Sequence, residues 1–269
     1  MRRIGVLFLL LLLTVSGKIY AAPVGLTSEA DSVEGNEIIR GSDAELSLGI
    51  ITDYIAEKKI DIDSGEFEMT AYMVRIGLNF LDRYNLYFDI GETDNVKFRY
   101  VLHGEENTVE FAGDTILGIG LSGLIYRWEN GIEIGASASY RHADMTLTKA
   151  TIGSAVWERG LMTHVTDDKY QEYQVAGELA WRTDLITPYI GVKYSYTELG
   201  CDFTIGGGSR RNTSSSNAAE NIGVFLGFTI TPTVNPKMNM IREGHRLSIN
   251  VEGRLIDEEA LSLGVDYRF

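Results

Sequence analysis

Apolar residues recur at every second position along most of the chain from residue 44 onward. In the first such run, Leu46, Leu48 and Ile50 alternate with Ser47 and Gly49. A period of two places alternate side chains on opposite faces of a β-strand. Ten runs of this kind lie at residues 46–54, 72–80, 84–90, 117–125, 132–140, 173–181, 190–196, 222–230, 247–251 and 261–269. The sequence therefore predicts an all-β chain of about ten antiparallel strands, with eight or twelve possible if a hairpin is miscounted.

The two faces of these runs differ in composition. One face carries Leu, Ile, Val and aromatic residues, and the other carries Gly, Ser, Asn and charged residues of both signs. In a soluble β-sandwich or lipocalin-like barrel the outward face would be charged, whereas the many glycines of the polar face suit a narrow lumen. Aromatic residues such as Tyr54, Trp128 and Trp181 lie near run ends, where a membrane barrel meets water. We therefore expect a closed transmembrane β-barrel over residues 44–269.

The lengths of the connections give this barrel a direction. Outer-membrane barrels have short periplasmic turns and longer external loops. Residues 92–112, 142–168 and 198–218 form long connections, which we expect to be external loops. Short turns are expected at 81–83 and 129–131, the second of which contains the hairpin dipeptide Asn-Gly.

The first 43 residues have no such alternation. Residues 1–22 have two arginines near the start, a 12-residue apolar run and a small-residue end, which is the layout of a secretory signal peptide. An uncleaved anchor is the alternative, but 12 residues fall short of the roughly 20 that a spanning helix needs. Residues 23–43 are polar and are expected to be a flexible lead-in. We expect the chain to be exported, with 21 basic and 38 acidic residues after cleavage, or a net charge of −17.

The last nine residues, LSLGVDYRF, end in Phe and have apolar or aromatic residues at every second position. This segment resembles the C-terminal strand by which outer-membrane β-barrels are delivered to the barrel assembly machinery. The segment 187–196 is similar to the strand after a periplasmic turn in small opacity-type outer-membrane proteins, which usually have eight strands. The resemblance implies a location in the outer membrane, with its lipid and lipopolysaccharide and the assembly machinery as partners. The implied assembly signal comprises Leu261, Leu263, Val265, Tyr267 and Phe269.

The polar faces of the runs carry a balanced set of charges, which we expect to line the lumen. Because an unpaired buried ion is costly, a balanced set in a narrow barrel is expected to form ion pairs. Wide aqueous channels belong to barrels of about 16 strands. A lumen plugged by an ion-pair network is therefore favoured over a conducting pore. The set comprises Glu45, Asp53, Asp89, Glu133, Glu178, Glu252, Asp266, Arg75, Arg141, Arg182, Lys193, Arg246, Arg254 and Arg268.

Composition and motifs exclude several other classes of function. A formal charge of −14 argues against nucleic acid as a partner, and a single Cys excludes a disulfide framework. We identify no metal site, no cofactor and no catalytic set. His142 and His164 lie in or beside the long connections, near Asp144, Asp167 and Asp168, but no enzyme motif includes them.

The function that we expect is structural, adhesive or ligand-contacting, acting through the long external connections. A narrow porin-like channel for small solutes is the alternative. A hydrolase built on the external loops is a third possibility.

Overall fold

The computed structural model describes most of the chain from residue 44 onward. The described segments are residues 44–61, 65–80, 83, 84–102, 104–183, 185–205, 209–217, 221–231 and 246–269. The expected signal peptide at 1–22, the lead-in at 23–43 and most of the connection at 231–244 lie outside them. Among the described residues, no helix has the length and apolar character needed to cross a bilayer.

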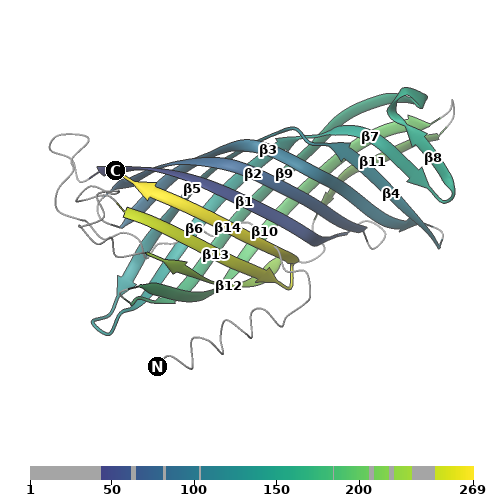
Figure 1. The fold of residues 1–269 in the computed structure, drawn as a ribbon. Coiled ribbons are helices and arrows are strands. Elements are labelled where there is room, and N and C mark those ends of the chain that lie inside the picture. The colour runs from purple at the N-terminus through teal and green to yellow at the C-terminus, as the bar shows by residue number, and fades with distance from the viewer. Residues whose placement is uncertain are drawn as a thin grey trace.

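Ten antiparallel strands form the wall of a closed barrel (Figure 1). Strand β1 pairs with both β2 and β14, and a further pairing of β2 with β3 closes the ring. Each of the ten predicted runs lies in one of these strands, except that Phe269 follows the end of β14, and the prediction of a ten-stranded barrel is confirmed. The wall strands are β1 (Ala44–Ile60), β2 (Gly65–Phe80), β3 (Tyr84–Leu102), β5 (Thr115–Arg127), β6 (Ile132–Asp144), β9 (Met162–Trp181), β10 (Ile186–Ile205), β12 (Ile222–Ile230), β13 (Arg246–Leu255) and β14 (Glu258–Arg268).

Several strands continue far past the wall at the end opposite the C-terminus (Figure 1). There β3 pairs with β4 (Glu105–Ala112), β4 with β7 (Thr146–Ile152), and β7 with β8 (Ala155–Glu158). A short 3₁₀ turn, η1 (Arg159–Leu161), leads into β9, and β11 (Ser209–Asn217) pairs with β10. We call this region the extension. The expectation that 92–112, 142–168 and 198–218 are loops was wrong about their secondary structure, because the described residues of these segments are largely in β-strands.

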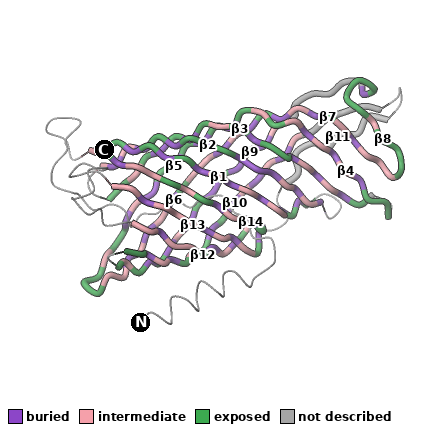
Figure 2. Tube along the Cα trace, viewed as in Figure 1, coloured by how far each residue is buried: buried purple, intermediate pink, exposed green. Residues whose placement is uncertain are grey.

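On the wall, the apolar stripe of each strand faces outward. Ile50, Val175 and Val192 are 64%, 58% and 61% exposed, whereas the intervening residues are mostly buried (Figure 2). Only a bilayer leaves so many large apolar side chains uncovered by protein without penalty, and a closed barrel satisfies its backbone hydrogen bonds inside the membrane. The predicted orientation of the two faces is confirmed.

In the extension the polarity of the two faces reverses. Phe98, Phe111 and Leu147 point inward and are buried. The outward face carries a row of residues of alternating charge that crosses β2, β3, β4, β7 and β8. Each residue of the row is paired with the next one on the adjacent strand. The reversal marks the boundary of the membrane, because a charged outer face requires water or headgroups. This row runs through Glu68, Lys97, Glu110, Lys149 and Glu158.

Glycines on the inward face make room for aromatic rings from the next strand. A Cβ atom on Gly120 would lie 2.3 Å from the ring of Tyr87, and one on Gly191 would lie 2.2 Å from the ring of Phe225. The rings therefore fill space in the lumen that side chains at the glycines would otherwise occupy. This packing explains the Gly-rich polar face that the sequence shows.

Candidate functional site

The candidate site is the middle of the lumen, where side chains from opposite walls meet. Around the ring the strands follow the order β1, β2, β3, β5, β6, β9, β10, β12, β13, β14. Strand β9 is therefore five places from β1 in either direction, directly across the barrel. A contact between β1 and β9 spans the lumen.

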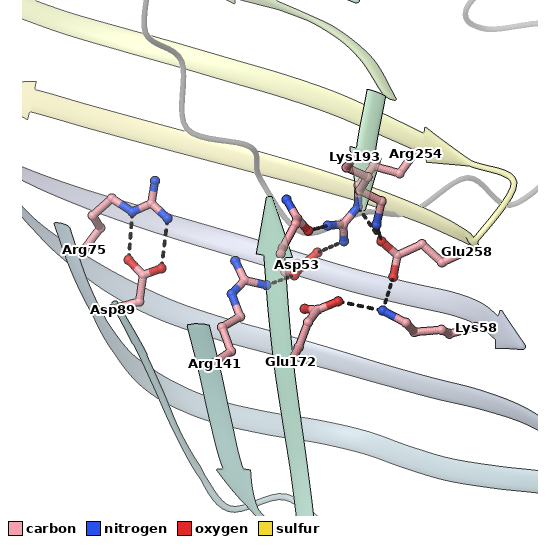
Figure 3. Close-up of polar contacts among 10 residues, drawn as sticks. Asp53, Lys58, Arg75, Asp89, Arg141, Glu172, Lys193, Arg254 and Glu258 are labelled. Carbon is pink, nitrogen blue, oxygen red and sulfur yellow. Dashed lines mark hydrogen bonds and ion pairs between the residues drawn. The ribbon is translucent and has the colours of Figure 1, made fainter. Parts of the chain in front are cut away.

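Lys58 makes this contact. It follows a bulge in β1, which turns the side chain inward, and it is fully buried. Its Nζ lies 2.6 Å from Glu172 Oε1 on β9 and 3.2 Å from Glu258 Oε2 on β14 (Figure 3). One ammonium group thus joins two carboxylates that come from different sides of the barrel.

A second set of contacts surrounds Asp53, also on β1. Arg141 on β6 donates to Asp53 Oδ2 at 2.7 Å. Arg254 on β13 lies with Nη2 3.8 Å from Asp53 Oδ1 and with Nε 2.9 Å from Glu258 Oε1. Arg254 also donates to Gln174 Oε1 on β9 at 3.3 Å. Arg141 thus links β6 to β1 across the lumen, and Arg254 links β13 to β9 across the lumen.

Lys193 on β10 completes the group. Its Nζ lies 2.7 Å from Asp257 Oδ2 and also contacts Glu258. Ser195 donates to Asp257 Oδ2 at 2.9 Å. We call the four acids and four bases the central ion-pair cluster; its members are Asp53, Glu172, Asp257, Glu258, Lys58, Arg141, Lys193 and Arg254. Equal numbers of opposite charges make it formally neutral.

A separate ion pair lies beside the cluster, between neighbouring strands. Arg75 on β2 binds Asp89 on β3 through two hydrogen bonds of 2.7 and 2.8 Å (Figure 3). The Arg75 guanidinium also lies 3.6 Å from the ring centroid of Tyr87. A bidentate pair with a stacked ring holds the arginine in one orientation.

Apolar side chains fill the lumen next to the cluster and continue into the extension. Phe67 on β2 stacks on Tyr170 on β9, with ring centroids 5.3 Å apart. Ile55, Phe67, Ile116, Leu147 and Tyr170 are each completely buried in one continuous cluster. Because β2 and β9 are four places apart in the ring, this packing also crosses the lumen.

Nearer the C-terminal end of the barrel, polar contacts continue. Tyr189 donates to Glu252 at 2.9 Å and accepts a hydrogen bond from Asn250 at 2.9 Å. Arg127 and Arg182 lie 2.6 and 3.8 Å from Glu133 Oε1. Polar and ionic contacts therefore extend over much of the barrel's length.

Ten of the fourteen expected lumen charges are buried in the structure, and the other four, Glu45, Arg182, Arg246 and Asp266, are half-buried, with Arg182 just past the end of β9. It brings Asp53, Arg141, Lys193 and Arg254 into the central ion-pair cluster. Arg75 and Asp89 form a pair of their own, and Glu133 meets Arg182. The remaining residues lie elsewhere along the lumen, several of them near the chain ends of β1, β13 and β14; these are Glu45, Glu178, Arg246, Glu252, Asp266 and Arg268.

Sequence reasoning missed half of the central cluster: Lys58, Glu172, Asp257 and Glu258. The alternation of polar and apolar residues indicates that two of them, Glu172 and Glu258, face the lumen. Glu172 lies two positions before Gln174 on the polar face of its run, and Glu258 lies four positions before Ser262. The bulge between Ile55 and Lys58 breaks the period of two, so the inward orientation of Lys58 does not follow from the pattern.

Of the two histidines beside the long connections, the structure describes the side chain of His142. His142 contacts the Asp144 carboxylate at 3.2 Å and the Gln171 amide at 3.4 Å, and no Ser, Thr or Cys side chain is among these contacts. The side chains of His164, Asp167 and Asp168 lie outside the described residues. Among the side chains that the structure describes, no group of three or more His, Cys, Asp or Glu could hold a metal ion.

The closed antiparallel wall and its apolar outer face define the class of protein: it is a β-barrel of the outer membrane. The sequence matches no protein-family profile and no curated protein. The class rests on the geometry of the chain itself.

Solved structures of similar shape are bacterial β-barrels of low sequence identity. The β-domain of the Bordetella autotransporter BrkA is 13% identical, with a TM-score of 0.47 over 84% of this chain and 99% of that chain. An outer-membrane channel from Pseudomonas putida F1 is 10% identical, with a TM-score of 0.37 over 88% and 99%. The translocator domain of the autotransporter NalP from Neisseria meningitidis is 9% identical, with a TM-score of 0.38 over 85% and 88%.

Proposed function

We propose that the protein is a non-conducting outer-membrane barrel that presents its extension to partners outside the cell, in a structural, adhesive or ligand-contacting role. The observation that carries this proposal is the direct contact of Lys58 on β1 with Glu172 on β9, across the full width of the ring. Arg141 and Arg254 bridge the lumen on either side of it. Together with the apolar cluster beside them, these contacts support a barrel filled by its own side chains.

The β-structure of the extension supports a role in contacting partners outside the cell. Its inner face is part of the buried apolar cluster that continues from the lumen and includes Phe98, Phe111 and Leu147. Hydrogen-bonded β-strands hold its outer face, where Lys149 pairs with Glu110 at 2.9 Å. Loops that are held by a rigid scaffold are the usual place for recognition. The short turns and the C-terminus lie at the opposite end, which corresponds to the periplasmic side of barrels of this type.

Planar-bilayer recording of the purified full-length protein tests the proposal. We expect no stepwise currents from the wild type, because the ion pairs of the central cluster bridge the lumen. The double variant Lys58→Ala/Glu172→Ala removes the bridge across the lumen, whereas Lys149→Ala/Glu110→Ala removes a pair of the extension and is the matched control. Currents from the wild type would overturn the proposal in favour of a narrow diffusion channel.

The hydrolase alternative is tested separately. Peptide and lipid A substrates are incubated with the wild type and with His142→Ala. We expect no turnover, because the described contacts of His142 are one carboxylate and one amide and include no Ser, Thr or Cys side chain for it to activate. Turnover that disappears in His142→Ala would overturn the proposed contact role.

We also propose that β14 acts as the assembly signal and that the resemblance to opacity-type proteins is one of architecture. The Phe269 amide donates to the Leu46 carbonyl at 3.0 Å, so the last residue closes the seam between the first and last strands. Tyr267 and Phe269 pack edge to face, with centroids 5.1 Å apart, at the C-terminal end of the barrel.

A further inference from the structure

A groove with a volume of about 490 Å³ runs over the outer wall across β3, β5, β6, β9 and β10. Leu86 and Leu121 stand on one side of it, and Tyr173 and Val175 stand on the other. Between them is Ala138 on β6, which is paired with Leu121 and Val175 on its two neighbouring strands. A methyl side chain between larger neighbours leaves the wall hollow at this point.

The next outward row of paired residues is Gly123, Ala136 and Gly177, none of which has a side chain larger than a methyl group. The ring of Tyr84 on β3 lies over Gly123, because a Cβ atom there would be 2.7 Å from it. This ring bounds the hollow on the side away from the extension.

Tyrosines close the end of the groove toward the extension. Tyr140 and Tyr173 lie side by side with ring centroids 4.7 Å apart, and Tyr173 and Tyr196 follow at 6.4 Å. The next outward row is polar, with His142 paired with Gln171. The groove thus begins at the membrane boundary, where tyrosine rings are favoured, and extends under the apolar band.

We propose that this groove binds one acyl chain of a membrane lipid. The groove is continuous with the lipid-facing wall, and its lining is almost entirely apolar, so a hydrocarbon chain fits it and a polar ligand does not. The flanking side chains Leu121, Tyr173 and Val175 are 45%, 50% and 58% exposed. They project beyond the floor at Ala138 and would hold the wall of a second barrel away from it, whereas a single chain can lie between them.

Native mass spectrometry of the full-length protein tests the proposal. The probe is palmitoyl-oleoyl-phosphatidylethanolamine, added to delipidated protein in detergent, with lipopolysaccharide in a second arm. The variant Ala138→Phe fills the groove. The control Thr52→Phe adds the same side chain to the outward face of β1, away from the groove. Heat-modifiable gel migration confirms that both variants are folded.

We expect the wild type and Thr52→Phe to retain one lipid in both arms, because the groove contacts the chain and not the headgroup. Ala138→Phe should lower retention about tenfold, which corresponds to the lost contacts of about two methylenes. Equal retention by wild type and Ala138→Phe would overturn the proposal. So would retention of lipopolysaccharide alone, which would indicate headgroup binding. A wild-type dimer that Ala138→Phe converts to a monomer would instead assign the groove to a second copy of the chain.

Discussion

Removal of the Lys58 ammonium is the most informative perturbation of the lumen. In Lys58→Met the methylene chain is largely kept, but Glu172 and Glu258 lose the cation that lies 2.6 and 3.2 Å from them. The central cluster would then hold four acids and three bases. Breaking a buried ion pair by removing one partner costs about 3–5 kcal/mol. We expect the free energy of unfolding to fall by about that amount.

Variants of Glu172, the partner of Lys58, test whether the loss of stability comes from an unpaired carboxylate. Glu172→Gln leaves Lys58 paired with Glu258 and should cost less than Lys58→Met. The double variant Lys58→Met/Glu172→Gln restores three acids to three bases, so it should be more stable than Lys58→Met alone. A double-mutant cycle then gives a coupling energy of about 1–3 kcal/mol between the two sites.

Urea unfolding of the barrel in lipid vesicles, followed by tryptophan fluorescence and by heat-modifiable gel migration, measures these changes. Lys149→Met, in the ion pair on the outer face of the extension, is the matched control and should change stability by less than about 1 kcal/mol. The reasoning is refuted if Lys58→Met is as stable as the wild type. Strict additivity of the two single changes would also refute a direct bridge across the lumen.

The remaining predictions concern packing, the membrane boundary and assembly. Gly120→Ala places a methyl group 2.3 Å from the Tyr87 ring and should lower the free energy of unfolding in urea by about 1–3 kcal/mol. The control Gly160→Ala meets nothing within 4 Å and should leave stability unchanged. Equal effects of the two changes would contradict the packing of the ring over the glycine. Val192→Arg, on the lipid-facing wall, should cost about 2–4 kcal/mol in vesicles, while Val156→Arg, equally exposed but in the extension, should cost under about 1 kcal/mol. A similar cost for both arginines would place the membrane boundary elsewhere. Phe269→Ala should lower the heat-modifiable, folded fraction in isolated outer membranes relative to Phe80→Ala, and unchanged assembly would remove the proposed role of the last residue as a signal.

The wall was predictable because lipid and lumen impose opposite demands on alternate residues. Each run such as 173–181 contains enough residues for the period of two to identify both the strand and its orientation. The segments beyond the membrane were harder to interpret. Val96 and Phe98 alternate just as Leu86 and Phe88 do, but they face inward, and local sequence does not show where the polarity reverses.

The central cluster was only partly predictable for a related reason. Alternation tells which residues of a strand face the lumen, but not which strands lie opposite one another. The pairing of Lys58 with Glu172 joins residues 114 positions apart and depends on the closed ring order. It also depends on a bulge that shifts the register after Ile55, which no composition rule locates.

We infer that the ions in the middle of this lumen serve specificity more than stability. The neighbouring apolar cluster shows that Ile, Phe and Leu side chains can fill the same barrel, and apolar replacements for a buried ion pair are often neutral or stabilising. What the ions add is a requirement on register. A slip of β9 by one residue would turn Glu172 toward lipid and leave Lys58 with one carboxylate fewer. Because the bridged strands share no backbone hydrogen bonds, the charges constrain which walls face each other, a constraint that the hydrogen-bond ladder between neighbouring strands does not supply.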